Sequence, residues 1–156
     1  ASSPFIYQKI YGLSPVGFSL CFALNALFTA FGCALSGKVG NEYKALKIAG
    51  AGMFVFAIAV AVALMTHALL PILQVAFMGL TFMLGMSQPP ATALALNAER
   101  TNAGTAAAAI GASGFLMGGI VSPLVGMGDI ATSASIVLLV GAVLTLGSVL
   151  VIRSGR

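Results

Sequence analysis

Few side chains in this chain are able to do acid–base, nucleophilic or metal chemistry. They are the carboxylates Glu42, Glu99 and Asp129, the single histidine His67, and the cysteines Cys21 and Cys33. No two of the carboxylates form a catalytic pair, and no set of residues has the composition of a triad or of a metal site. Both cysteines fall inside an apolar run, where a thiol behaves as a small hydrophobic group. The sequence therefore predicts no enzyme, no catalytic residue, no metal site and no cofactor.

The composition explains why these side chains are scarce. Of the 156 residues, 60% are hydrophobic and 6% are charged, whereas a soluble domain has about 25% charged residues. The mean hydropathy is +1.09. So few charges cannot cover a water-exposed surface, and the sequence predicts an integral membrane protein in contact with the lipid bilayer. The net charge of +4 comes from scattered cations that form no patch, so nucleic acid is not an expected partner.

The charged residues divide the chain into apolar runs that are long enough to cross a bilayer. Uncharged runs cover 10–37, 48–98, 101–128 and 130–152, and one spanning helix needs about 20 residues. The longest run holds two helices, with a break marked by His67 and Pro71. The expected fold class is all-α, a polytopic transmembrane helix bundle. Its five full spans are expected at about 15–36, 46–65, 70–97, 103–126 and 131–152, and residues 1–10 are expected to be the outer end of a preceding helix.

The distribution of lysine and arginine predicts the orientation of the bundle. If the 37–47 loop is cytoplasmic, the inner side holds Lys38, Lys44, Lys47, Arg100, Arg153 and Arg156, and the outer side holds Lys9 alone. The positive-inside rule then places the C-terminus in the cytoplasm. All three carboxylates and His67 fall in loops, where solvated side chains are expected. Tyr7 and Tyr11 are expected to be interfacial anchors at the outer surface.

Two of the expected spans carry polar residues along one face. In the 15–36 span, Asn25 lies near mid-membrane on the same side as Phe18 and Phe22. An amide in this position needs a partner, which is either an interhelical hydrogen bond or a polar cavity. In the 70–97 span, a longer stripe runs from Gln74 to Thr92. The candidate wall of a substrate cavity consists of Phe18, Phe22, Asn25, Gln74, Met78, Thr81 and Gln88.

Prolines and glycines suggest where helices bend and pack. Pro89 and Pro90 remove two backbone donors and are expected to bend the inner end of the 70–97 span, as a gate or as simple packing of a bent helix. The 103–126 span has small residues in one sector, including a GxxxG motif, which allows a close helix–helix contact. The glycines expected to pack there are Gly104, Gly111, Gly114 and Gly118. The 46–65 and 131–152 spans have no comparable polar face and are expected at the lipid side.

Three stretches resemble the C-terminal half of a major facilitator superfamily transporter, in its Bcr/CflA drug-resistance branch. Residues 3–14 resemble the outer end of the seventh helix and the loop after it. Phe22-Ala23-Leu24-Asn25-Ala26 resembles the eighth helix, and 103–106 together with 122–126 resembles the eleventh. The resemblance implies that residues 1–156 are the C-terminal six-helix half of a transporter, incomplete at its N-terminal end. The 37–47 loop lacks the run of arginines that this branch often has after its eighth helix.

The resemblance also implies a function. Members of the branch export hydrophobic drugs in exchange for protons and reside in the bacterial inner membrane. The expected partners are the N-terminal half of the same transporter, a hydrophobic small molecule and protons, with the proton site in the other half. The alternative from another class is a non-transporting membrane scaffold or assembly subunit that uses the glycine stripe of the 103–126 span to bind a partner.

Overall fold

The computed structural model describes residues 7–8, 11–98, 100–125 and 130–151. Within these ranges the chain is helical. The elements are α1 (Pro15–Ser36), η2 (Gly37–Val39), α2 (Glu42–Met65), α3 (Leu70–Ala98), η3 (Arg100–Asn102), α4 (Ala103–Val125) and α5 (Ile130–Val151). All five α-helices are long and apolar enough to cross a membrane. The expected all-α bundle with five spans is therefore confirmed. The expected positions of Lys9, Glu99, Asp129, Arg153 and Arg156 lie outside the described residues.

Local capping sets the starts of α1 and α2. Before α1, the Ser14 hydroxyl accepts a hydrogen bond from the Gly17 backbone N–H at 3.2 Å, and Pro15 occupies the first helical position. Before α2, Asn41 Oδ1 accepts from the Lys44 N–H at 2.9 Å. Both are standard N-caps, because they satisfy amides that have no partner inside the helix.

The expected start of the second span at residue 46 is wrong. Because Asn41 is the cap, α2 begins at Glu42, so this carboxylate is in the first helical turn and not in a loop. A negative charge is favourable there, since it faces the positive end of the helix dipole. Lys44 and Lys47 also belong to the helix. The expectation that the carboxylates lie in loops therefore fails at Glu42 for a local reason, the cap.

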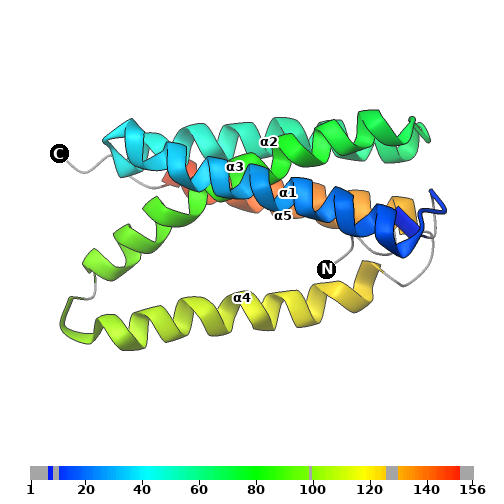
Figure 1. Ribbon diagram of the computed structural model, residues 1–156. Coiled ribbons are helices and arrows are strands. Elements are labelled where there is room, and N and C mark those ends of the chain that lie inside the picture. The colour runs from blue at the N-terminus through cyan, green and yellow to red at the C-terminus, as the bar shows by residue number, and fades with distance from the viewer. Residues whose placement is uncertain (1–6, 9–10, 99, 126–129, 152–156) are drawn as a thin grey trace.

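Four helices form a bundle, and α4 stands apart from it. Figure 1 shows α1, α2, α3 and α5 side by side, while the C-terminal end of α3 leaves the bundle and leads to α4. In the most apolar stretch of α4 no residue is buried, whereas α2 has the largest buried share of the five helices. The interior of the described chain therefore lies between α1, α2, α3 and α5.

The burial of α2 corrects the expectation that it lies only at the lipid side. Its alanines at positions 45, 49, 57 and 61 are at most 3% exposed, and they pack towards α3 and α5. The opposite face of α2 remains apolar and exposed, with Val55 and Val62 as examples. This packing face consists of small apolar residues. A polar pattern does not mark it, because helices in lipid also associate by close approach of small side chains.

The closest contact in the bundle joins α1 and α3 backbone to backbone. A Cβ atom on Gly32 would lie 2.0 Å from the Phe82 carbonyl oxygen, and one on Gly85 would lie 2.0 Å from the Thr29 carbonyl oxygen. No side chain fits at either position, so two glycines from different helices permit this contact. It lies just before Pro89 and Pro90 in α3.

The surface of the bundle is apolar. Exposed large side chains cover the described helices, among them Val16, Phe31, Val55, Ile72, Phe115 and Leu144. In water such a surface would be unfavourable, but in a bilayer it is the solvent-facing surface, and helices satisfy most of their backbone polar groups internally. The chain is therefore a multi-pass membrane protein in contact with lipid.

Candidate functional site

A cluster of uncharged polar side chains joins three elements inside the bundle. The Tyr7 hydroxyl donates a hydrogen bond to Gln74 Oε1 at 2.5 Å. Gln74 Nε2 in turn donates to Asn25 Oδ1 at 3.1 Å and to the Cys21 carbonyl oxygen at 3.2 Å. Tyr7 is 0% exposed, Asn25 7% and Gln74 8%. These three side chains, the polar cluster, connect α1, α3 and the segment before α1.

Aromatic rings surround the polar cluster. The Tyr7 ring lies between Phe18 of α1 and Phe77 of α3, with ring centroids 6.0 and 5.8 Å away. Phe22 continues the row along α1, 6.0 Å from Phe18, and is 56% exposed. The row therefore leads from the surface of α1 to the buried amides. Such a site combines an apolar wall with a few uncharged donors and acceptors, which is typical of sites for small molecules.

The structure brings only part of the predicted wall together. Phe18, Asn25 and Gln74 meet in and beside the polar cluster, with Phe22 at its edge. Met78 and Thr81 follow Gln74 along α3 and are half-buried, and the Thr81 hydroxyl donates to the Phe77 carbonyl oxygen of its own helix at 2.9 Å. Gln88 is exposed near the other end of α3. Asn25 makes the interhelical hydrogen bond that was one of its two expected roles.

The sequence pattern missed Tyr7 as a member of this site. Tyr7 was expected at the membrane surface, but it is completely buried. Tyr11 is half-buried and donates its hydroxyl to the Ala68 carbonyl oxygen at 2.7 Å, which ties the same segment to the turn between α2 and α3. No periodic pattern could have revealed this, because both tyrosines precede α1 and their partners are more than 50 residues away.

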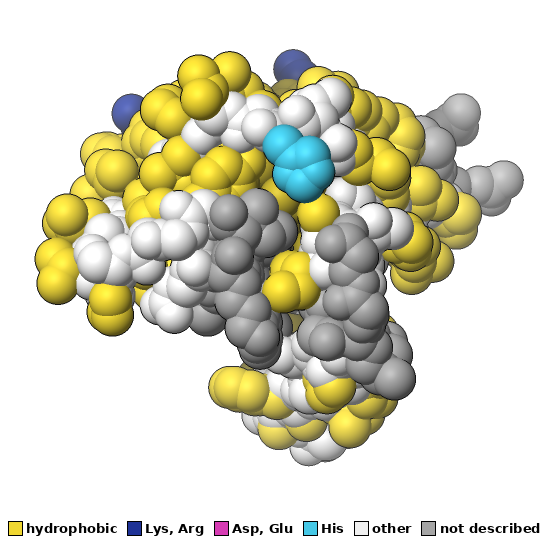
Figure 2. Space-filling view, turned by 90° about the vertical axis from the view of Figure 1, so that its right-hand side faces the viewer, with side chains coloured by type: hydrophobic (Ala, Val, Ile, Leu, Met, Phe, Trp, Pro, Cys, Tyr) yellow, Lys and Arg dark blue, Asp and Glu magenta, His cyan; other side chains and the backbone are white. Residues whose placement is uncertain are grey.

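The turn between α2 and α3 is the place where a break was predicted. His67 adopts a left-handed backbone conformation, with φ of 48°, and is exposed as expected. Figure 2 shows its imidazole at the surface of this end of the molecule. His67 is exposed, so it faces solvent or lipid headgroups and not the interior of the bundle.

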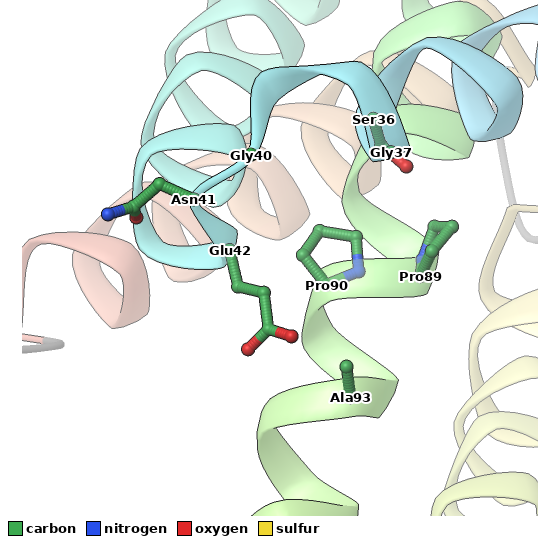
Figure 3. A pocket seen from close by; sticks show the side chains of 8 residues that line it. All are labelled: Ser36, Gly37, Gly40, Asn41, Glu42, Pro89, Pro90 and Ala93. Carbon is green, nitrogen blue, oxygen red and sulfur yellow. The ribbon is translucent and has the colours of Figure 1, made fainter.

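A hollow lies at the opposite end of the bundle, where α1 ends and α2 begins. A cavity of about 300 Å³ is lined by Ser36, Gly37, Gly40, Asn41, Glu42, Pro89, Pro90 and Ala93. Figure 3 shows the Glu42 carboxylate directed towards α3 near Pro90 and Ala93, while the Asn41 side chain points away as the cap of α2. The predicted bend residues thus line a hollow together with the carboxylate of α2.

The two prolines do not interrupt α3, which continues to Ala98. Pro89 has no N–H, so the carbonyl oxygen of Gly85, four residues earlier, lacks its usual helical donor. Cys33 of α1 donates its thiol to this oxygen at 3.1 Å. The thiol was expected to be only a small hydrophobic group, but it supplies a donor that proline cannot.

The glycines of α4 contact nothing within the described chain. A Cβ atom on Gly104, Gly111, Gly114 or Gly118 would meet no atom within 4 Å. The close packing expected at this stripe is therefore absent among the described helices, and it stays a prediction for a partner surface. Among the described residues there is also no group of three or more His, Cys, Asp or Glu side chains able to hold a metal ion.

One known protein is similar to most of this chain. It is a Bacillus subtilis (strain 168) protein named "Uncharacterized MFS-type transporter YdgK", 33% identical over 132 residues, which make up 83% of this chain and 33% of that protein. The chain thus spans about one third of the length of the relative that it matches. No family model and no solved structure matches the chain. The chain is therefore similar to part of a protein named as an MFS-type transporter, and it has five helices that are long and apolar enough to cross a membrane.

Proposed function

We propose that this chain is the C-terminal part of a secondary active transporter of the bacterial inner membrane, with its C-terminus in the cytoplasm. The transporter exports hydrophobic drugs in exchange for protons by alternating access. The observation that carries the proposal is the similarity over 132 residues to a protein named as an MFS-type transporter. A five-span bundle with an apolar surface agrees with it, because transporters of this kind rock one bundle against another around a site at mid-membrane.

In this proposal the polar cluster and its aromatic row provide the substrate wall of this half. The proposed wall is Phe18, Phe22, Asn25, Gln74, Met78, Thr81 and Gln88. Its support is that Phe18, Phe22, Asn25 and Gln74 are neighbours on α1 and α3. No charged side chain takes part in these contacts, and an ionisable group in a span marks the usual place for proton coupling. The proton site therefore belongs to the rest of the transporter.

The remaining proposed roles concern motion and assembly. Pro89 and Pro90 act as a gate at the cavity beside Glu42, where α3 lacks two backbone donors. The open glycine stripe of α4 packs against the N-terminal half of the same transporter, since Gly111 and Gly114 have free space around them.

The test is transport by the complete protein in inverted membrane vesicles. Asn25→Ala and Gln88→Ala should each lower the efflux of a fluorescent hydrophobic drug, and a protonophore should abolish it in the wild type. Leu24→Ala is the matched control on α1, since Leu24 is exposed next to Asn25. Unchanged efflux of every tested drug in both variants would remove the wall assignment. Efflux that persists after the pH gradient collapses would remove proton coupling.

The second candidate is a non-transporting scaffold or assembly subunit, which the open glycine stripe of α4 also favours. The coding sequence upstream of Ala1 separates the two. Six further spans with an intramembrane acidic residue support the transporter. Vesicles that show no efflux while Gly114→Leu abolishes a stable complex with another membrane protein support the scaffold.

A further inference from the structure

The polar cluster is a chain of neutral hydrogen bonds from Tyr7 through Gln74 to Asn25. Tyr7 donates to Gln74 Oε1, and Gln74 donates to Asn25 Oδ1. Among the described residues, no buried side-chain nitrogen or oxygen lacks a partner. Tyr7 and Asn25 therefore both depend on Gln74, because the apolar surroundings offer no water in exchange.

Tyr7 differs from the other two members in its origin. Asn25 and Gln74 belong to α1 and α3, which the glycine contact at Gly32 and Gly85 holds together. Tyr7 enters from the segment before α1 and inserts its ring and hydroxyl between the two helices. The Tyr7 carbonyl oxygen accepts from the Leu13 N–H at 3.1 Å, so this segment folds back on itself. The Tyr7 side chain thus occupies a site formed by α1 and α3 without belonging to either helix.

The site that Tyr7 fills has a defined chemistry. Phe18 and Phe77, both tilted against the Tyr7 ring, line the slot that this ring occupies, and the Gln74 carboxamide oxygen accepts the hydroxyl hydrogen there. Among the described residues no charged side chain contacts this site, and a charged group brought into it would lose its hydration without gaining a counter-ion from them. A ligand that takes this place must therefore be uncharged and must carry a hydroxyl group on an aromatic or similarly flat ring.

We propose that the Gln74–Asn25 amide pair is a recognition site for an uncharged, hydroxyl-bearing aromatic ligand, and that the Tyr7 side chain occupies this site in the present structure. The proposal rests on the proposed transport function, for which it names the substrate class. Tyr7 is then a positioning residue: its hydroxyl holds the Gln74 amide with the nitrogen towards Asn25, so that the oxygen remains directed at the slot. An entering ligand replaces the Tyr7 side chain and makes the same hydrogen bond.

The experiment removes the Tyr7 side chain and then adds small aromatic molecules that replace its ring, with or without the hydroxyl group. Purified Tyr7→Ala in detergent micelles is titrated with p-cresol, which reproduces the missing phenol, and with toluene, which lacks only the hydroxyl. Binding is measured from the rise in Tm with probe concentration. We expect about tenfold tighter binding of p-cresol, as one hydrogen bond to a buried amide provides. Tyr7→Ala/Gln74→Leu should bind both probes equally.

Leu73→Ala is the matched control. Leu73 is 0% exposed and lies beside Gln74 in the apolar core, so the cavity left there should not prefer p-cresol over toluene. Equal binding of the two probes by Tyr7→Ala would overturn the proposal, because the site would then recognise shape alone. A preference for p-cresol that survives Gln74→Leu would also overturn it.

If Tyr7→Ala does not fold alone, its folded yield becomes the measurement. Addition of p-cresol, but not of toluene, should then restore the yield, and failure of both probes would contradict the proposal. None of these assays involves transport. A negative result here leaves the transporter proposal intact, and loss of the transporter proposal leaves the binding result intact.

Discussion

The contact between α1 and α3 and the surface of α4 are both built around glycine, but they differ in what an added side chain would meet. At Gly32 and Gly85 a Cβ atom would lie 2.0 Å from a backbone oxygen of the other helix. At Gly111 and Gly114 it would meet nothing within 4 Å. The GxxxG motif in α4 is the more recognisable pattern, yet the described chain uses single glycines in α1 and α3. A small-residue motif thus shows where a helix could approach and not whether it does.

The two regions also differ in polar contacts. The α1–α3 region contains the polar cluster and the Cys33 thiol on the Gly85 carbonyl oxygen. On α4 the Ser113 hydroxyl donates a hydrogen bond to the Ile110 carbonyl oxygen of its own helix. In the α1–α3 region polar side chains thus link the same two helices whose backbones approach at Gly32 and Gly85. The following predictions test this difference through the free energy of unfolding, measured by adding SDS to the protein in dodecyl maltoside micelles.

The largest expected effect comes from Gly85→Ala. The new methyl group would clash with the Thr29 backbone of α1, so the helices must separate, and the free energy of unfolding should fall by about 3 kcal/mol. Gly114→Ala in α4 is the control, where helix propensity should raise stability by up to about 1 kcal/mol. Equal effects at the two positions would remove the contrast between the regions.

The next effect is expected from Gln74→Leu. This change removes the hydrogen bonds to Tyr7, Asn25 and the Cys21 carbonyl group. A loss of about 2 kcal/mol follows, because the remaining polar groups stay buried without a partner. Gln88→Leu on the exposed part of the same helix should change stability by less than about 0.5 kcal/mol. If both glutamines prove equally dispensable, the polar cluster does not hold α1 to α3.

A smaller effect is expected at Cys33. Cys33→Ala leaves the Gly85 carbonyl oxygen without the donor that replaces the missing Pro89 N–H, and stability should fall by about 1 kcal/mol. Cys33→Ser keeps a donor and should lose less. Cys21→Ala removes a thiol of similar burial that donates no hydrogen bond in the described structure, so it measures the packing loss alone. A loss at Cys33 no greater than at Cys21 would mean that the thiol acts only by packing.

The smallest effect on stability is expected for Gly118→Leu in α4. Because a Cβ atom added at Gly118 would meet nothing within 4 Å beyond its own stretch of helix, the free energy of unfolding of residues 1–156 should change by less than about 0.5 kcal/mol. In the complete protein, the same variant should lower transport strongly if another part packs on this stripe. Normal transport by the variant would show that the stripe is a lipid-facing surface.

Much of the fold followed from where charges are absent. The break at His67 and the ends of α1 and α3 were predicted to within one residue. The charge pattern misplaced the start of α2, because Asn41 caps a helix that begins four residues earlier, at Glu42. The site was predictable only in part. Asn25 and Gln74 stand out as amides in apolar helices, but nothing in the local pattern connects either to Tyr7.

The sequence by itself determined that this protein crosses a membrane and roughly where, because the cost of placing charges in hydrocarbon depends on composition along the chain. Only the tertiary structure decided which helices touch, since the same glycine can face a neighbouring backbone, as Gly85 does, or open space, as Gly114 does. It also decided the partners of the buried amides. A hydrogen bond over 67 residues of chain, such as that from Tyr7 to Gln74, depends on how the segments pack, and no spacing within one helix encodes it.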